Sequence, residues 1–249
     1  MKYKALILDL DGTTIANYSP NPPTPRVTEA IKKAHKRIHI SIATGRPLYE
    51  VKHLIDHLEL SGPCILNNGS QIYDPVRKKI IHEVLFHKEL VPSIYAFCKK
   101  RRLEVRMFNG IQDIVYTGEP IPGKVLSLYI PRGSIKTMDA LVAYCSTLPH
   151  VATHRMITLK EGFHSVEITH TDASKLHGIV EVMRHLNIQT EEIIGVGDSY
   201  NDYPLLMACG LKIAMGNAVP ELKAIADFVA PTVEEDGVAT VIEKFILSQ

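Results

Sequence analysis

The chain has 249 residues, of which 45% are hydrophobic, so it is long enough for one large domain or two smaller ones, each with a core. Lys and Arg together outnumber Asp and Glu by 28 to 27, and this balance gives no electrostatic case for nucleic-acid binding. No stretch approaches the roughly 18 apolar residues of a membrane helix, and the first apolar run is cut short by Asp9, which argues against a secretory signal.

The four cysteines are widely spaced and form no Cys-x-x-Cys pair, which argues against a zinc or redox site. We expect Cys64, Cys98, Cys145 and Cys209 to be reduced and mainly buried, in a cytoplasmic protein that has no membrane partner.

The first part of the chain alternates between short apolar runs and segments of helical spacing. Strands are predicted over residues 4–8, 38–43 and 64–66, and helices over residues 27–38, with Thr28 as cap, and 47–58, beginning at Pro47. This alternation is typical of a doubly wound parallel sheet.

The pattern changes between residues 80 and 168. Short, partly alternating runs predict strands over residues 84–86, 105–108, 113–116, 125–130, 151–157 and 165–168, with helices over residues 88–100 and 135–147. Strands that follow one another in this way indicate an antiparallel sheet, and hence a separate α+β lobe.

The strand–helix alternation then returns. Helices are predicted over residues 175–186, 202–208 and 240–247, and strands over residues 192–196 and 211–214. The predicted fold class is therefore α/β, a Rossmann-like doubly wound parallel sheet core (residues 1–82 and 170–249) with an inserted α+β cap domain (residues 83–169).

Polar side chains follow four of the strands predicted for the core, at the point where each strand ends. These residues are Asp9 and Asp11, Thr44, Asn67 and Asn68, and Asp198 and Asp202. Because open α/β sheets bind ligands at the carboxyl ends of their strands, we expect these side chains to share one site.

The acid pairs have a chemical and a simpler interpretation. Asp9 and Asp11 are two residues apart, so one can act as a nucleophile while the other handles protons. Together with Asp198 and Asp202 they suggest a pocket for a hard divalent metal ion. Alone, Asp-x-Asp-Gly-Thr is also typical of a turn or a helix cap. A calcium loop is disfavoured, since its twelfth position is Pro20 rather than Glu.

The remaining candidates are weaker when each is taken alone. Thr44-Gly45-Arg46 offers a hydroxyl beside a flexible backbone, which suits a phosphate oxygen, whereas Lys175 alone is typical of a solvated helix residue. The pairs His35/His39 and His53/His57 have the spacing of helical metal ligands but lack the Glu of a His-Glu-x-x-His site, so we interpret them as surface residues.

In combination and in chain order, these segments resemble the haloacid dehalogenase superfamily. Asp9-Leu10-Asp11-Gly12-Thr13 is similar to its first motif, Thr44-Gly45-Arg46 to its second, Lys175 to its third, and the segment from Gly197-Asp198 to Asn201-Asp202 to its fourth. The large insertion after the third strand resembles the α/β cap of the Cof-type subgroup, known as a C2B-type cap.

The resemblance implies a role for each residue. Asp9 would attack phosphorus and form an aspartyl-phosphate, and Asp11 would act as general acid and then general base. The remaining roles are a Mg²⁺ site made by Asp9, the Asp11 backbone carbonyl and Asp198, with Asp202 behind them, a phosphate-binding site made by Thr44, Gly45, Arg46 and Asn201, and charge stabilisation by Lys175. Mg²⁺ and lysine are needed because a carboxylate attacks a phosphate dianion only when their repulsion is screened.

We therefore predict an enzyme, a Mg²⁺-dependent phosphatase that acts on a small phosphorylated metabolite such as a sugar phosphate or a phosphoglycolate-like acid, as a monomer or homodimer. A phosphomutase of the same fold would use the same aspartyl-phosphate but return the phosphoryl group to a sugar. A non-catalytic phosphate-binding regulatory protein is the third alternative, and the intact acid positions argue against it.

Overall fold

The structure is a computed structural model that describes residues 2–17, 19–157 and 161–248. Contacts divide the chain into two compact units: unit 1 is Met1–His82 with Ser174–Gln249, and unit 2 is Glu83–Ala173. Each unit has its own hydrophobic core.

Unit 1 is built on a parallel sheet of five strands. Their order across the sheet is β13-β12-β11-β1-β2, with bounds Phe228–Val229, Leu211–Ala214, Ile193–Gly197, Ala5–Leu8 and His39–Ile42. An isolated parallel bridge between Ala43 and Ile65 brings the next strand, β3 (Cys64–Leu66), alongside β2. Every residue of β1 is fully buried, as expected for a central strand covered on both faces.

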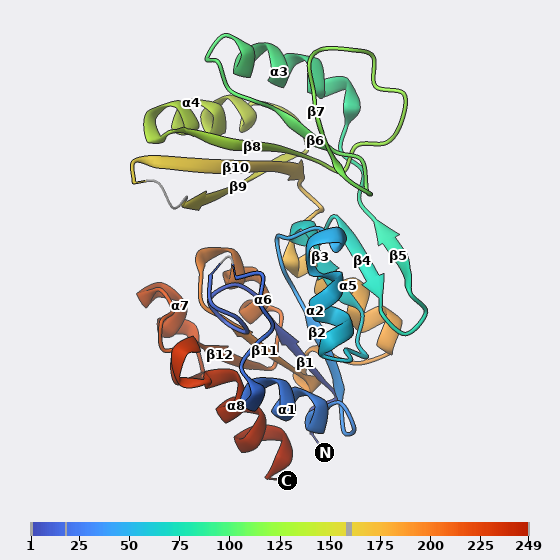
Figure 1. The fold of residues 1–249 in the computed structure, drawn as a ribbon, viewed down its shortest axis with the longest axis vertical. Coiled ribbons are helices and arrows are strands. Elements are labelled where there is room, and N and C mark those ends of the chain that lie inside the picture. The colour runs from blue at the N-terminus through green and yellow to red at the C-terminus, as the bar shows by residue number, and fades with distance from the viewer. Residues whose placement is uncertain (1, 18, 158–160, 249) are drawn as a thin grey trace. The chain divides into compact units, whose positions relative to one another are not determined.

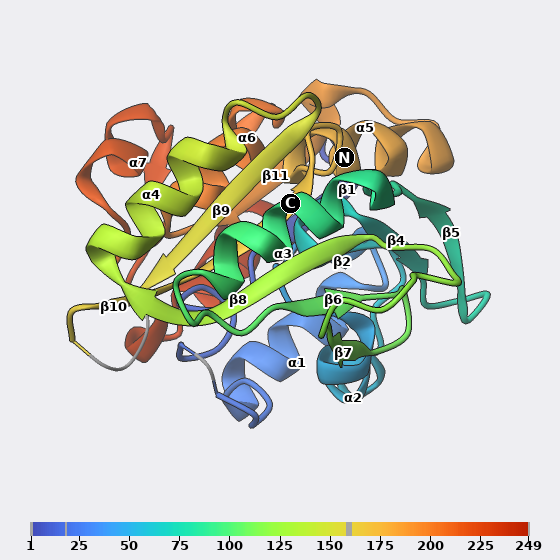
Figure 2. The ribbon, with the colours of Figure 1, turned by 90° about the horizontal axis from the view of Figure 1, so that it is seen from above.

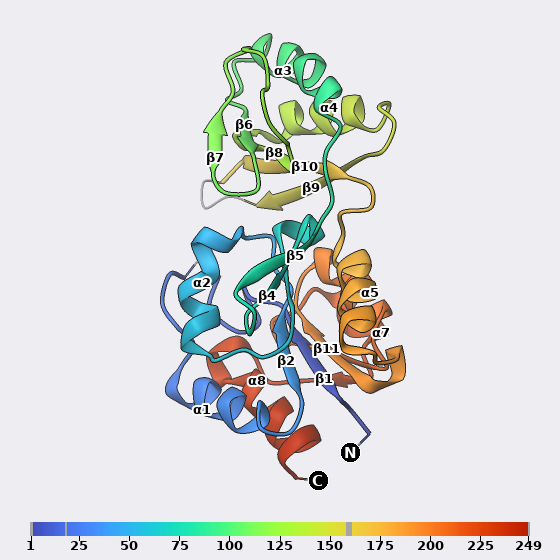
Figure 3. The same ribbon diagram turned by 90° about the vertical axis from the view of Figure 1, so that its right-hand side faces the viewer.

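Helices cover both faces of this sheet. Figure 3 shows α1 (Pro25–Ala34) and α2 (Leu48–His57) on one side, with α5 (Lys175–Leu186) and α7 (Pro220–Ile225) on the other. The helix α8 (Gly237–Ile242), followed by a π-helical turn at Glu243–Leu247, packs on α1, and α6 (Tyr203–Met207) packs beside α5 and on β11. The predicted Rossmann-like α/β core is confirmed.

A second, three-stranded sheet of order β3-β4-β5 belongs to unit 1, except for Glu83 at the end of β5 (Figure 1). The strands β4 (Gln71–Asp74) and β5 (Lys79–Glu83) are joined by a turn in which Asp74 Oδ1 accepts the N–H groups of Val76 and Arg77. This hairpin was not expected. The strand predicted over residues 84–86 is wrong, because the chain pairs earlier, over β5.

Unit 2 contains a five-stranded antiparallel sheet of order β7-β6-β8-β10-β9. The strands, in that order, are Asp113–Val115, Arg106–Phe108, Ser127–Ser134, Phe163–His170 and Val151–Ile157. The helices α3 (Val91–Lys99) and α4 (Ile135–Cys145) lie on one face of the sheet (Figure 2). Their buried side chains Ile94 and Met138 share a core with Leu128 and Ile168 from the strands. This is the predicted α+β arrangement.

Short 3₁₀ segments connect several of these elements. They are η1 (Asn67–Gly69), η2 (Lys88–Leu90), η3 (Thr190–Glu192), η4 (Tyr200–Asp202) and η5 (Val233–Glu235). None of the helices in the described ranges is long and apolar enough to cross a membrane.

The predicted start of α1 needs correction. Thr24 caps the helix, since its Oγ1 accepts the Val27 N–H at 3.3 Å, and Pro25 takes the first helical position, where its missing N–H costs nothing. Thr28 lies inside the helix and donates to the Pro23 carbonyl at 3.3 Å. The helix ends at Ala34, four residues before the predicted end at residue 38.

Candidate active site

Asp9 directly follows β1 and continues its pairing with β11. Its N–H donates to the Val196 carbonyl at 2.9 Å, so Asp9 lies at the carboxyl end of the sheet beside the end of the neighbouring strand. Thr14 Oγ1 donates to the Asp9 carbonyl at 2.6 Å, which fixes the turn that follows. The side chain of Asp9 is only 7% exposed.

Lys175 joins two of the strand-end acids. It is the first residue of α5, a helix capped by Ser174, whose Oγ accepts the His177 N–H at 3.2 Å. Its Nζ lies 2.5 Å from both Asp9 Oδ1 and Asp202 Oδ1, and its side chain is 1% exposed. The alternative of a solvated surface lysine is therefore wrong.

Asp202 uses both of its oxygens inside the protein. While Oδ1 contacts Lys175, Oδ2 accepts the N–H groups of Asp198 and Ser199 at 3.0 Å each. Gly197 allows this arrangement, since a Cβ there would lie 2.5 Å from the Asp202 Cβ. Asp202 thus holds the loop after β11 in shape and positions the lysine.

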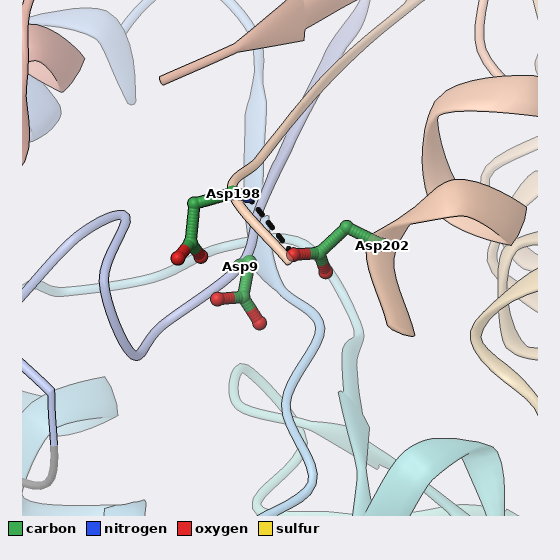
Figure 4. Close-up of side chains that lie close together, drawn as sticks. All are labelled: Asp9, Asp198 and Asp202. Atoms are coloured by element: carbon green, nitrogen blue, oxygen red, sulfur yellow. Dashed lines mark hydrogen bonds between the residues drawn. The ribbon is translucent and has the colours of Figure 1, made fainter. Parts of the chain in front are cut away.

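The carboxylates of Asp9, Asp198 and Asp202 form a compact cluster of oxygen donors. One oxygen from each lies within 4.8 Å of the others, although Asp9 is far from Asp198 and Asp202 in sequence (Figure 4). Thr13 Oγ1 donates to Asp198 Oδ1 at 3.1 Å. Because hard divalent cations prefer carboxylate oxygens, this donor set fits such a cation.

Burial dominates the electrostatics of the cluster. Burial, and then the charge of Asp202, raise the pKa of Asp9, against the opposing effect of Lys175. The same two causes raise the pKa of Asp198 to about 6. Burial lowers the pKa of Lys175, but Asp202 and Asp9 outweigh it, so the net effect on that pKa is a rise. The cluster contains one ammonium group and three carboxyl groups, so a further cation would stabilise it.

The loops after β2 and β3 interlock beside the acids. The buried Thr44 donates its N–H to the Ile65 carbonyl at 2.9 Å and accepts the Asn68 N–H on its carbonyl at 3.1 Å. Asn67 and Asn68 both adopt left-handed backbone conformations, with φ of 50° and 51°, which asparagine tolerates better than most residues. A Cβ on Gly45 would lie 3.1 Å from Asn68 Nδ2.

Asp11 and Arg46 form an ion pair across the first two strand-end loops. Arg46 Nε donates to Asp11 Oδ2 at 2.9 Å, and Arg46 Nη2 contacts Asp11 Oδ1. Asn201, in η4, is exposed. The structure therefore brings together Asp9, Asp198, Asp202 and Lys175, whereas Asp11 is held by Arg46.

Two further residues have supporting roles that the sequence analysis does not assign. Gly12 has a φ of +79°, and a Cβ there would lie 2.4 Å from Asp198 Oδ2, so the turn requires glycine. Asn217 Nδ2 donates to the Gly12 carbonyl at 2.8 Å, and Asn217 follows the end of β12. The strand-end rule that selected Asp198 would have selected Asn217 as well.

Other residues singled out in the sequence lie outside this cluster. The four cysteines are free and buried, as predicted, and burial raises their pKa values to about 12. His39, His53 and His57 are exposed and His35 is half-buried. Among the residues that the structure describes, the metal-type cluster contains only aspartates.

A Rossmann-like core that gathers acids from its strand ends around a buried lysine suits an enzyme of the phosphoryl-transfer class. The chain belongs to the haloacid dehalogenase-like hydrolases, whose family model matches residues 6–126 and 124–242, and within them to the Cof type. It is a phosphatase.

Individual relatives match over nearly their whole length. The chain is 25% identical to the 5-amino-6-(5-phospho-D-ribitylamino)uracil phosphatase YcsE of Bacillus subtilis, over 98% of this chain and 96% of that protein. It is 23% identical to phosphoglycolate phosphatase 1 of Saccharolobus solfataricus, with the same coverage of 98% and 96%. The structure of a subclass IIB sugar phosphatase is similar, with a TM-score of 0.80 and 25% identity over 97% of this chain and 98% of that one.

Proposed function

We propose that this protein is a Mg²⁺-dependent phosphatase that hydrolyses a small phosphorylated metabolite through an aspartyl-phosphate on Asp9. The observation that carries the proposal is a buried carboxylate paired with a buried ammonium, Lys175 Nζ to Asp9 Oδ1 at 2.5 Å, beside two further acids. Burying a carboxylate costs free energy, and a role in catalysis explains why Asp9 is nevertheless buried.

The metal would be held by Asp9, Asp198 and the backbone carbonyl of Asp11, with Asp202 orienting the neighbouring loop. When bound, Mg²⁺ supplies positive charge that screens the repulsion between the Asp9 carboxylate and a phosphate dianion. The protein's own contribution to the same screening is Lys175, which contacts Asp9 directly.

In the first step, an oxygen of Asp9 attacks phosphorus, and the bond between phosphorus and the leaving oxygen breaks. Asp11 gives its proton to that oxygen, so the product leaves as an alcohol. Thr44, Gly45 and Asn201 would hold the phosphoryl oxygens, with the Thr44 hydroxyl and backbone N–H groups as donors.

In the second step, Asp11 takes a proton from a water molecule whose oxygen attacks phosphorus. The bond between phosphorus and Asp9 breaks, inorganic phosphate is released, and Asp9 is regenerated. The substrate class is a sugar phosphate or a phosphoglycolate-like acid, in keeping with the activities of the relatives.

The test is phosphate release from a panel of sugar phosphates, polyol phosphates and phosphoglycolate, with Mg²⁺ and with EDTA. Metal-dependent release that is lost in Asp9→Asn supports the proposal. If Asp9→Asn keeps wild-type turnover, the proposed nucleophile is wrong. No release from the panel by folded, Mg²⁺-loaded protein would favour a phosphomutase or a binding role.

A further inference from the structure

Arg46 has been grouped with the phosphate-binding residues by its place in the second motif, but its contacts point elsewhere. Nε donates to Asp11 Oδ2 at 2.9 Å, Nη2 contacts Asp11 Oδ1, and Nη1 donates to the Ser19 carbonyl at 3.2 Å. Every nitrogen of the guanidinium therefore has an acceptor inside unit 1. The side chains of Arg46 and Asp11 are 14% and 23% exposed.

The backbone of Arg46 is fixed as firmly as its side chain. Its N–H donates to Thr44 Oγ1 at 3.1 Å, and its carbonyl accepts the Asn67 N–H at 3.1 Å. These contacts tie the loop after β2 to the loop after β3. The backbone from which the guanidinium reaches Asp11 is therefore fixed.

A two-point contact between a planar guanidinium and a carboxylate fixes direction as well as distance. Two parallel N–H···O bonds hold the carboxylate in the plane of the fork, which a lysine ammonium cannot do. The plane and rotamer of the Asp11 carboxylate are therefore set by Arg46. A general acid must present its proton within hydrogen-bond reach of the leaving oxygen, so its orientation affects its efficiency.

We propose that Arg46 is a positioning residue for Asp11 and not a ligand of the phosphoryl group. It acts on proton transfer to the leaving group by holding the Asp11 carboxylate in one orientation. This inference rests on the proposed function, in which Asp11 is the general acid and base.

The inference predicts that loss of Arg46 affects substrates unequally. An alkyl phosphate needs a proton on its leaving oxygen, whereas p-nitrophenolate leaves without one. Arg46→Ala should lower kcat/KM for a sugar or alkyl phosphate by about 10- to 100-fold, within the range of general acid catalysis, and that for p-nitrophenyl phosphate by less than about threefold. The inhibition constant of inorganic phosphate should change little.

A double-mutant cycle with Asp11 gives the sharper test. If Arg46 acts through Asp11, then Arg46→Ala adds no further loss in an Asp11→Asn background. Arg46→Lys, which keeps the charge but loses the fork, should recover only part of the alkyl-phosphate rate. Arg37→Ala is the matched control, because Arg37 is also anchored on backbone carbonyls of unit 1, those of Ile246 and Leu247, away from the acids.

Two results would overturn the inference. Equal losses on both substrate types, with weaker inhibition by phosphate, would make Arg46 a phosphoryl ligand. Full additivity of Arg46→Ala and Asp11→Asn would show that the two residues act independently. These failures differ from failure of the proposed function, in which either the wild-type enzyme releases no phosphate or Asp9→Asn keeps wild-type turnover.

Discussion

Two sets of ion pairs in this molecule use the same chemistry in opposite surroundings. In unit 1, Lys175 contacts Asp9 and Asp202, and the three side chains are 1%, 7% and 0% exposed. In unit 2, Arg155 of β9 pairs with Asp139 of α4, and these side chains are 33% and 56% exposed. The Lys175 set is shielded from solvent, whereas the Arg155–Asp139 pair is exposed to it.

This difference in exposure suggests different roles for the two sets: the buried charges serve the site, whereas the exposed charges only keep the surface polar. Removing charges from water costs several kcal/mol per ion, and a buried pair often contributes less to stability than apolar residues of similar volume. An exposed pair costs little to form and adds between about 0 and 1 kcal/mol. The buried set at the strand ends is therefore better explained by its use at the site than by stability.

The largest test of this contrast is Lys175→Met. The change leaves Asp9 and Asp202 buried without their cation, and we expect a loss of about 3–5 kcal/mol at neutral pH, or roughly 6–20 °C in Tm. The loss should shrink as the pH falls toward about 5, because Asp9, whose pKa is raised by burial, can then bind a proton. Thermal unfolding in EDTA measures both effects.

The control is Lys124→Met, which breaks the half-exposed pair with Glu83 in unit 2. It should change Tm by no more than about 2–4 °C. Similar losses for the two variants would remove the distinction between the two kinds of pair.

A second test sharpens the comparison through pH. The pKa of Asp198 is raised from 3.8 to about 6 on folding, so the folded chain binds more protons than the unfolded chain between these values. This carboxyl group therefore costs stability progressively as the pH rises from about 4 to about 6, by up to about 3 kcal/mol. Asp198→Asn removes that cost.

The measurement is the Tm of Asp198→Asn minus that of the wild type, in EDTA, across this pH range. The difference should become more positive as pH rises. Asp139→Asn, at an exposed position, is the control for the loss of a carboxyl group. If the difference for Asp198→Asn does not change with pH, the Asp198 carboxyl titrates as if it were in solvent.

The smallest expected effect is that of Asp139→Ala. It removes the exposed partner of Arg155, and we expect a change within about 1 kcal/mol and no change in phosphate release. Urea unfolding and the phosphate assay measure the two quantities. A loss as large as that of Lys175→Met would show that surface pairs in unit 2 matter as much as the buried set.

The sequence predicted the bounds of several elements well, and it predicted the site where a strand is followed by charged residues. The helix α5 was predicted with its observed bounds, Lys175–Leu186, and so was β12, Leu211–Ala214. The helix α7 and strand β13 were missed, because six and two residues are too short to display a period. Thr28 is the wrong cap because Pro25 takes the first helical position, which places the cap at Thr24.

The site shows the same limit in its contacts. The strand-end rule alone predicted that Asp9, Asp198 and Asp202 lie in one cluster. It did not predict the contact between Asp11 and Arg46, because that contact depends on how two loops far apart in sequence fold against each other. Asn217 also follows a core strand, β12, so the same strand-end rule predicts a site residue there.

The state of the cysteines has a practical consequence for labelling chemistry. Maleimides react with the thiolate, and burial that raises the pKa values of all four thiols to about 12 leaves almost none of it at neutral pH. A cysteine introduced at an exposed position such as Lys36 would therefore react alone. The native chain is ready for a single fluorescent or spin label without removal of any cysteine of its own.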